Sequence, residues 1–288
     1  MAEYQILVPP PRRHRTARIV VVIVVVVAAV AAGAFVIGRH STGGGQATSA
    51  RGGGTTAAAP LTLVSSVPAN GATDVPSNQV VSVHLSAPVV AGSGVPTFNP
   101  PVSGSWLKVG PDSLSFAATA PFIPTSTETL VIPGGASGLR SVDGRRLAAP
   151  ATITFTVAQA STERLQQLLA QLNFLPLSFT PSGSSAPAQA TTAQPGTFAW
   201  RWPGLPSTVT SLWTEGIEDV ITKGAVMNFE NQHGLTVDGL AGKDVWSALL
   251  ADVASGKVNA DPYVYVLVSK QLPENLTLYE NGAPTMAN

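Results

Sequence analysis

The residues that could take part in covalent catalysis are the first features to consider in this sequence. It contains no cysteine, which excludes a thiolate. A hydroxyl nucleophile needs an adjacent base, and the four histidines, His14, His40, His84 and His233, are far apart in the chain. His84 has no cluster of histidines or carboxylates around it, and because a metal site needs three or four ligands we interpret it as structural. We therefore expect no catalytic residue, no metal site and no cofactor.

Aromatic side chains are the next candidates for a chemical role. Residues 176–220 are rich in Ser, Pro, Ala, Thr and Gln, and we predict a long loop there, yet this segment contains Trp200, Trp202 and Trp213. A large ring with a polar edge can stack on a sugar or a peptide, so Trp200 and Trp202 are candidate ligand-binding residues. Aromatic residues more often hold a loop against its own domain, and that is the interpretation we favour.

Residues 221–250, ITKGAVMNFENQHGLTVDGLAGKDVWSALL, contain two predicted helices joined by a tight turn. Thr222 is the expected N-cap of the first helix, and Gly234 stands where that helix should end in a left-handed conformation. The residues expected to shape the turn or fill the core are Phe229, Asp238, Gly239, Gly242 and Trp246. Further upstream, leucines recur at helical spacing from Leu165 to Leu172, which predicts another amphipathic helix.

The run FENQHGLTVDGLAGKDVW resembles the peptidoglycan-binding type 1 family, whose members are small three-helix bundles, and residues 165–169 match the first helix of that family. Two features depart from the family pattern: the connection over 176–220 is unusually long, and Val245 precedes the tryptophan where many members have threonine. The resemblance implies that peptidoglycan, as muropeptide, is the ligand. It makes Asn231, Gln232 and His233, beside the turn, candidates for hydrogen bonds to muropeptide amides. For His233 we favour an ordinary solvated helix end.

An unbroken apolar run extends from Ile19 to Ile37 and predicts a single transmembrane helix. Four arginines precede the run between residues 12 and 18, whereas only Arg39 and Arg51 follow it closely, so the N-terminus is expected in the cytoplasm and the bulk of the chain on the outer, cell-wall side of the cytoplasmic membrane. The alternative is a cleaved secretory signal, with Ala32-Gly33-Ala34 as the cleavage region.

The residues from Leu61 to Val157 form short alternating apolar runs separated by Pro, Gly, Asn and Asp. We read strands at 80–85, 113–116, 128–132 and 152–157, which favours a β-sandwich of about a hundred residues. The segment VSSVPANGATDVPSNQVVSVHLSAPV resembles the opening of a bacterial Ig-like domain. This resemblance implies a spacer or adhesion module without chemistry of its own.

Residues 262–288 form a predicted β-hairpin that resembles the start of an L,D-transpeptidase catalytic domain. The nucleophile of that family is a cysteine in a Ser-His-Gly-Cys run much further along, and this run is absent from the present sequence. The resemblance leaves open that the chain is the front half of such an enzyme, from a truncated reading frame or a fragment.

These observations combine into a multidomain prediction: a single transmembrane helix, an all-β Ig-like sandwich, an all-α three-helix peptidoglycan-binding module and a C-terminal β-hairpin. The expected segments are a basic tail (1–18), a membrane helix (19–38), a flexible linker (39–60), the sandwich (61–158), the binding module (161–253, with the loop 176–220) and the hairpin (262–288).

Composition limits the function of the chain. Only 11% of the residues are charged and the formal net charge is zero, so nucleic acid is not an expected partner. The function we predict is cell-wall attachment by a membrane-anchored, peptidoglycan-binding protein. The alternatives are the front half of an L,D-transpeptidase, which cross-links peptidoglycan, and a spacer or scaffold that binds nothing.

Overall fold

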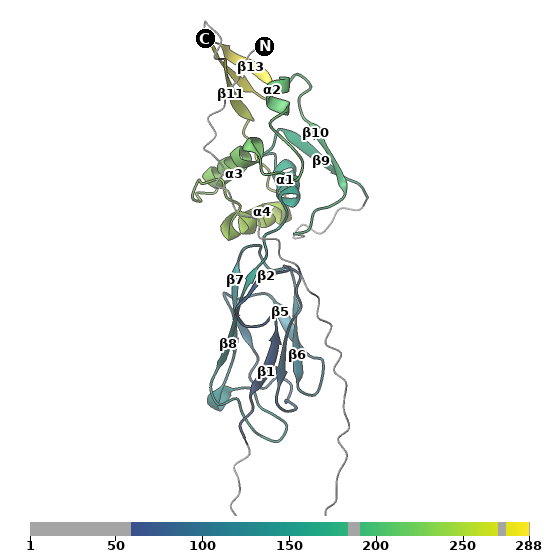
Figure 1. Ribbon diagram of the computed structural model, residues 1–288, viewed down its shortest axis with the longest axis vertical. Coiled ribbons are helices and arrows are strands. Elements are labelled where there is room, and N and C mark those ends of the chain that lie inside the picture. The colour runs from purple at the N-terminus through teal and green to yellow at the C-terminus, as the bar shows by residue number, and fades with distance from the viewer. Residues whose placement is uncertain (1–58, 184–190, 270–274, 288) are drawn as a thin grey trace, which may run out of the picture. The chain divides into compact units, whose positions relative to one another are not determined.

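The computed structural model describes residues 59–183, 191–269 and 275–287 (Figure 1). The first domain in these ranges is a β-sandwich. One antiparallel sheet has the order β1 (Leu63–Val67), β3 (Val81–Leu85), β6 (Ser113–Ala118) and β5 (Gly104–Lys108). The other has the order β2 (Ala72–Val75), β8 (Ala151–Val157), β7 (Thr127–Ile132) and β4 (Thr97–Asn99), with β2 and β8 parallel. A short 3₁₀ helix, η1 (Gly135–Ser137), lies between β7 and β8 in sequence.

Alternating side chains form this sandwich because successive residues of a strand point to opposite faces of the sheet. In β3, Val81, Val83 and Leu85 are buried, whereas Ser82 and His84 are half-buried. The same pattern buries the apolar residues of β7 and β8 in one shared core. The predicted sandwich is confirmed, and the four strands read from the sequence are β3, β6, β7 and β8.

The second domain combines helices with a strand pair. Its elements are α1 (Thr162–Gln171), β9 (Leu177–Pro181), β10 (Gly196–Trp200), α2 (Ser207–Thr210), α3 (Val220–Gln232) and α4 (Lys243–Ser255). Helices α1, α3 and α4 contribute large apolar side chains to its core that are fully buried, among them Leu168, Leu169, Phe229, Trp246 and Leu249. Each such side chain favours folding by about 1.5–3 kcal/mol relative to an exposed position.

This domain differs from the predicted all-α module. The segment predicted as a loop over 176–220 contains the antiparallel pair of β9 and β10 and the short helix α2. Phe179 and Phe198 face each other across the pair with ring centroids 4.9 Å apart, and Trp213 packs on Phe198 at 5.0 Å. Cross-strand aromatic pairs stabilise such a ribbon, and here they also pack against the helical core.

The helix ends follow the sequence with one correction. The first turn of α3 is capped by Asp219, whose carboxylate accepts a hydrogen bond of 2.8 Å from the backbone N–H of Thr222. The predicted N-cap, Thr222, is instead a buried residue inside the helix. Gly234, just after α3, has a φ of +64°, which is the left-handed conformation expected there.

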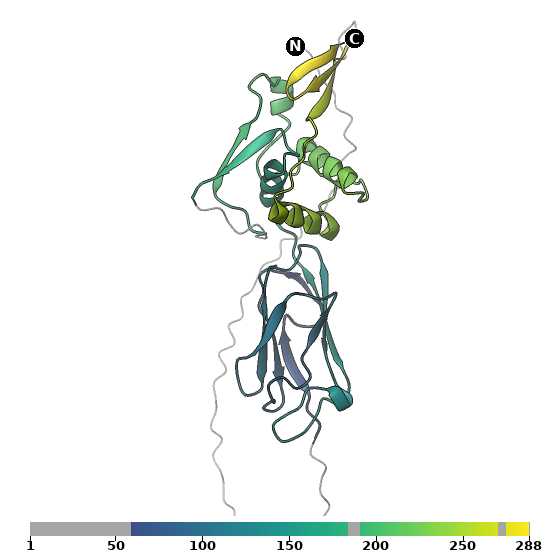
Figure 2. The same cartoon turned by 180° about the vertical axis from the view of Figure 1, so that it is seen from behind.

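The C-terminal strands form a three-stranded antiparallel sheet of β11 (Val264–Ser269), β12 (Asn275–Glu280) and β13 (Ala283–Ala287). The sequence predicted a hairpin, and the third strand is added after the Asn281-Gly282 turn, where both residues have positive φ. Figure 2 shows these strands, in yellow, beside α2. Tyr265 and Leu267 of β11 pack against the helical core.

The predicted fold class is corrected with respect to its transmembrane helix. No helix within the described ranges is long and apolar enough to cross a membrane. The longest, α3 and α4, have 13 residues each, which corresponds to about 20 Å, whereas a bilayer core is about 30 Å thick. The predicted span from Ile19 to Ile37 lies outside the described residues, as do the basic tail and nearly all of the linker.

Candidate functional site

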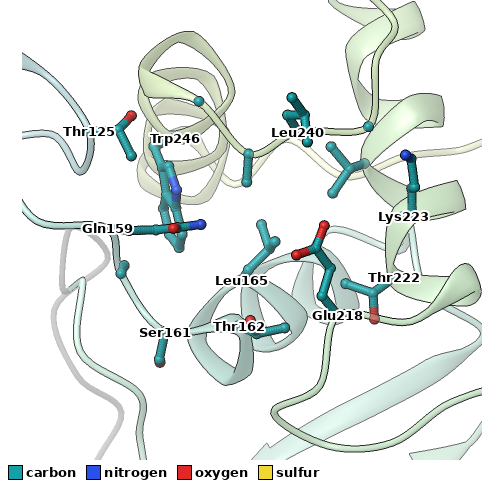
Figure 3. Close-up of a pocket in the computed structure, with 15 residues that line it drawn as sticks. Thr125, Gln159, Ser161, Thr162, Leu165, Glu218, Thr222, Lys223, Leu240 and Trp246 are labelled. Atoms are coloured by element: carbon teal, nitrogen blue, oxygen red, sulfur yellow. The ribbon is translucent and has the colours of Figure 1, made fainter. Parts of the chain in front are cut away.

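A groove with a volume of about 310 Å³ lies between the start of α1, the first half of α3 and the turn that leads into α4. In Figure 3, Gln159 and Trp246 lie on one side of the groove and Thr222 and Lys223 on the other, with Leu165 between them. This volume is at the lower end of the range for ligand-binding pockets, which starts at about 300 Å³.

The floor of the groove is apolar and contains one unpaired donor. Leu165, Val226 and Trp246 are 7%, 1% and 1% exposed. The indole N–H of Trp246 is buried without a hydrogen-bond partner among the described residues. A buried donor left unpaired costs about 1–3 kcal/mol.

The rim of the groove carries opposite charges and an exposed leucine. Glu218 precedes α3 and Lys223 lies in its second turn; both are exposed, and neither forms an ion pair within the described part of the chain. Leu240, in the turn before α4, is 59% exposed. The groove therefore offers an apolar floor with a carboxylate and an ammonium group at its edge.

A buried carboxylate holds the turn that forms one wall of the groove. Glu230 of α3 is 1% exposed, and its Oε2 accepts hydrogen bonds from the backbone N–H groups of Asp238 at 3.1 Å and Gly239 at 2.8 Å. Burial raises the pKa of Glu230, and the hydrogen bond from Gly239 opposes this shift. Gly239 has a φ of +72°, which a residue with a side chain rarely adopts.

A buried amide fixes the loop that carries Glu218. Gln166 of α1 is fully buried, and its Nε2 donates to the carbonyl oxygens of Thr214 and Ile217, each at 3.0 Å, and to Oγ1 of Thr222 at 2.9 Å. Its Oε1 accepts from the backbone N–H of Gly216 at 2.7 Å. One side chain thus attaches the loop before α3 to both α1 and α3.

Comparison with known families assigns the two domains. The family model described as a putative peptidoglycan binding domain matches residues 205–249, and that of a bacterial Ig-like domain matches residues 57–157. The chain carries both domains. Residues 205–249 include α2, α3, the turn at Gly239 and the first half of α4, and most of the residues that line the groove lie in α3, in the segment before it, in this turn and in α4.

Solved structures similar to parts of the chain include two L,D-transpeptidases and an S-layer protein. An L,D-transpeptidase from Mycobacterium smegmatis is 18% identical, with 36% of this chain and 42% of that chain covered and a TM-score of 0.26. L,D-transpeptidase 3 from Mycobacterium tuberculosis is 17% identical over 34% and 38% of the two chains, with a TM-score of 0.25. The N-terminal part of the bacterial S-layer protein SbsC is 14% identical over 35% and 24%, with a TM-score of 0.27.

The chain covers about two fifths of the length of the L,D-transpeptidase structures that it matches. No curated protein matches the sequence.

The polar residues predicted as muropeptide contacts lie at the far end of α3 from the groove of the peptidoglycan-binding domain, and none of them lines it. Asn231 is exposed and makes no side-chain hydrogen bond within the described ranges. Gln232 donates from Nε2 to the side chains of Asn259 and Asp261, at 2.9 Å each. These positions remain predictions as ligand contacts.

His233 is held in place by its own domain. Its Nε2 lies 2.8 Å from Oδ2 of Asp252 in α4, its Nδ1 lies 2.8 Å from the carbonyl oxygen of Phe229, and its ring stacks on the Phe229 ring with centroids 3.9 Å apart. Lys257 contributes a further contact to Nε2 at 3.1 Å. The imidazole therefore joins the end of α3 to α4, rather than being an ordinary solvated side chain.

The two candidate tryptophans have different surroundings. Trp200 packs with Trp213, at 6.2 Å between ring centroids, against the helical core. Trp202 lies two residues further on and stacks on Tyr263 at 5.9 Å, away from the groove. The residues predicted to shape the turn and core do so: Phe229 and Trp246 are buried, Asp238 and Gly239 form the turn, and Gly242 precedes α4.

His84 lies beside a serine and an aspartate on the surface of the sandwich. Its Nδ1 is 3.1 Å from Oγ of Ser113 and 3.5 Å from Oδ1 of Asp112, and Ser113 donates to Asp112 at 3.1 Å. In a catalytic triad the acid and the nucleophile contact different nitrogens of the imidazole. Here both contact Nδ1, so the arrangement does not position His84 as a general base oriented by Asp112.

Sequence reasoning missed the residues that form the rim and supports of the groove: Gln166, Glu218, Lys223, Glu230 and Leu240. Glu230 and Leu240 lie inside the run that carries the family resemblance, so their proximity to the turn was a signal that could have singled them out. Gln166 gave a weaker signal, as an amide between leucines on a helix expected to be buried on one face.

Proposed function

We propose that this chain is a non-catalytic protein of the cell-wall side that attaches to peptidoglycan through the groove between α1, α3 and α4. The observation that carries the proposal is the coincidence of two independent results. The family model for peptidoglycan binding covers residues 205–249, and most of the groove is lined by those residues.

The chemistry of the groove suits the peptide stem of peptidoglycan. An apolar floor accommodates the small aliphatic side chains of such a peptide. Glu218 and Lys223 at the rim have the charges needed to pair with the amine and carboxylate groups of a stem peptide. Exposed ion pairs of this kind contribute only about 0–1 kcal/mol each, so we expect weak binding to a polymer with many sites.

The proposal is tested by sedimenting the full chain with purified cell-wall sacculi. Leu240→Asp places a charge at the apolar rim of the groove, where the side chain is 59% exposed, and should leave the fold intact. We expect about tenfold weaker binding for this variant, which corresponds to about 1.4 kcal/mol. The measurement is the fraction of chain in the pellet across a range of sacculus concentrations.

Val237→Asp is the matched control. Val237 belongs to the same connection between α3 and α4 and is 46% exposed, but it does not line the groove. The control should bind like the parent chain. If Leu240→Asp and Val237→Asp bind equally well, the groove is not the binding site, and if the parent chain stays in the supernatant, the proposed function is wrong.

The sandwich is proposed to act as a spacer that holds the binding domain away from its point of attachment. Its described surface contains no cluster of three metal-ligating side chains, and the Ser113, His84 and Asp112 arrangement is not that of a catalytic triad. Peptidoglycan is a polymer outside the cytoplasm, so the proposed function requires an exported chain.

A further inference from the structure

A second hollow lies at the junction of the helical core and the C-terminal sheet. Its volume is about 370 Å³, and it is formed by the ends of α1 and β10, the loop after α4 and the turn between β12 and β13. None of its lining residues lines the groove, and none belongs to residues 205–249. It is therefore a separate feature from the proposed peptide site.

The aromatic part of this hollow is rigidly supported. Trp202 stacks on Tyr263 with an interplanar angle of 28° and centroids 5.9 Å apart. Behind the indole lies Gly282, where an added Cβ would approach Cβ and Cγ of Trp202 to 2.6 and 2.9 Å, and where φ is +79°. The turn thus accepts only glycine at this position, and Trp202 and Tyr263, both half-buried, form one apolar wall of a hollow that is open to solvent.

The polar part of the hollow is rich in hydrogen-bonding groups. Glu280 lines it without a hydrogen-bond partner among the described residues, and Asp261 uses only Oδ2, to accept from Gln232 at 2.9 Å. Asn281 uses its Oδ1 to accept from the backbone N–H of Tyr263 at 3.0 Å, which leaves its amide N–H groups available to a ligand. The hollow therefore combines two carboxylates, which can accept hydrogen bonds from ligand hydroxyls, with an amide, which can donate to a ligand carbonyl.

The charge of the lining disfavours an acidic ligand. Arg201 is the cation of the hollow, and it already donates to the carbonyl oxygens of Leu177 at 3.1 Å and Ala170 at 2.7 Å. Asp261 and Glu280 outnumber it, and their charges would repel the free carboxylates of a stem peptide. A neutral ligand with one apolar face and several hydroxyls fits this environment better.

We infer that this hollow is a saccharide subsite, in which one N-acetylated hexosamine ring lies with its apolar face on Trp202 and its hydroxyls toward Asp261 and Glu280. The N-acetyl carbonyl is the expected acceptor for the free amide of Asn281. The inference rests on the proposed function for its polymer, because the glycan strand of peptidoglycan supplies such rings. Once one weak site holds the polymer, the other site meets a high effective concentration of the same polymer, so the two sites together attach more strongly than either alone.

The test is a titration of the full chain with chitotetraose, a peptide-free oligomer of N-acetylglucosamine, followed by the indole N–H signals in NMR spectra. The Trp202 signal is assigned by its absence in Trp202→Ala. We expect chitotetraose to shift this signal, and Trp202→Ala to weaken binding by about tenfold. Glu280→Gln changes an exposed side chain that makes no hydrogen bond among the described residues, and it should weaken binding about threefold without affecting the fold.

Two controls separate this inference from the proposed function. Glu215→Gln changes an exposed glutamate that lines neither hollow and should bind chitotetraose like the parent. Leu240→Asp should lose affinity for sacculi and retain affinity for chitotetraose. If sacculi sediment the chain but chitotetraose shifts no signal, or if Glu280→Gln binds it as well as the parent, the subsite is wrong while the groove stands.

A peptide-only outcome would also overturn the inference. If a sugar-free stem tetrapeptide shifts the Trp202 signal and chitotetraose does not, the hollow is a peptide site. If chitotetraose binds as expected but Leu240→Asp retains full affinity for sacculi, the saccharide subsite stands and the proposed role of the groove is wrong.

Discussion

Glu230 is the single side chain on which the turn of the groove depends most. Its carboxylate accepts two backbone N–H groups, from Asp238 and Gly239, at a position almost without solvent exposure. The hydrogen bonds favour the charged form and burial disfavours it, and burial is the larger effect, so the pKa is raised above its ordinary value of 4.5. Ionisation of Glu230 is therefore less favourable in the folded chain than in water.

Substitutions at Glu230 should separate these two effects. In Glu230→Ala the two N–H groups lose their acceptor, and we expect a loss of about 2 kcal/mol in the free energy of unfolding. Glu230→Gln keeps an acceptor oxygen and removes the titration. Because the folded-state pKa is raised, the folded chain binds more protons than the unfolded chain above pH 4.5, so the contribution of Glu230 is complete below that pH and declines as the pH rises through the folded pKa.

The measurement is thermal unfolding of the parent and both variants between about pH 4 and about pH 7. Glu230→Gln should gain in melting temperature relative to the parent as the pH rises, since it no longer buries a charge. A difference between Glu230→Gln and the parent that stays constant across this range would contradict the assignment.

At the scale of elements, the loop before α3 and helix α1 act as one unit through Gln166. Its two amide N–H groups are shared among three acceptors, and its Oε1 accepts from one donor, all from residues 214–222, which are about 50 residues away in sequence. Buried networks of this kind are favourable when every member is paired and costly when one is removed. The loop positions Glu218 at the rim, so its order matters for the groove as well as for stability.

Gln166→Leu should therefore destabilise the module and disturb the groove together. We expect a loss of about 3 kcal/mol, because the N–H of Gly216 and the carbonyl of Ile217 lose their partner and the carbonyl of Thr214 keeps only the N–H of Ile217. The measurement is urea unfolding followed by tryptophan fluorescence, to which the module contributes four of the five tryptophans. Gln171→Leu, at an exposed position of α1, is the matched control and should unfold like the parent. Equal midpoints for the two variants would show that the Gln166 network is unimportant.

The same elements show what the sequence could reveal. Strands such as β3 and β8 could be predicted from the sequence because each buries one face and so alternates apolar and polar residues. The turn at Gly239 could be predicted because its backbone conformation favours glycine. The pair of β9 and β10 was missed although Leu177 and Phe179 alternate with Ser178 and Thr180, because each strand has only five residues and the surrounding segment is rich in Ser, Pro, Ala and Thr. The packing of Phe179 on Phe198 stabilises the pair. The groove and the second hollow join residues far apart in sequence, which no local pattern encodes.

At the scale of the whole molecule, the chain combines a proposed binding groove with the absence of cysteine. Its 288 residues include no cysteine, and the described sandwich contains one serine beside a histidine, Ser113 next to His84. Acyl transfer to and from a serine needs a base held in the correct tautomer by a second group and donors for the oxyanion. Because Asp112 and Ser113 contact the same nitrogen of His84, the acid does not orient the base toward the serine.

We therefore predict that the 288-residue chain performs no acyl transfer on peptidoglycan peptides, whichever of its domains holds the polymer. The full chain is incubated with a stem tetrapeptide donor and an amine acceptor, and mass spectrometry is used to search for a cross-linked product or an acyl adduct on the protein. Neither should appear above a heat-inactivated control, and Ser113→Ala should give the same result as the parent. An adduct that maps to Ser113 and disappears in Ser113→Ala would mean that the His84 cluster rearranges into a working base, since a serine has no other route to the deprotonated form at this site.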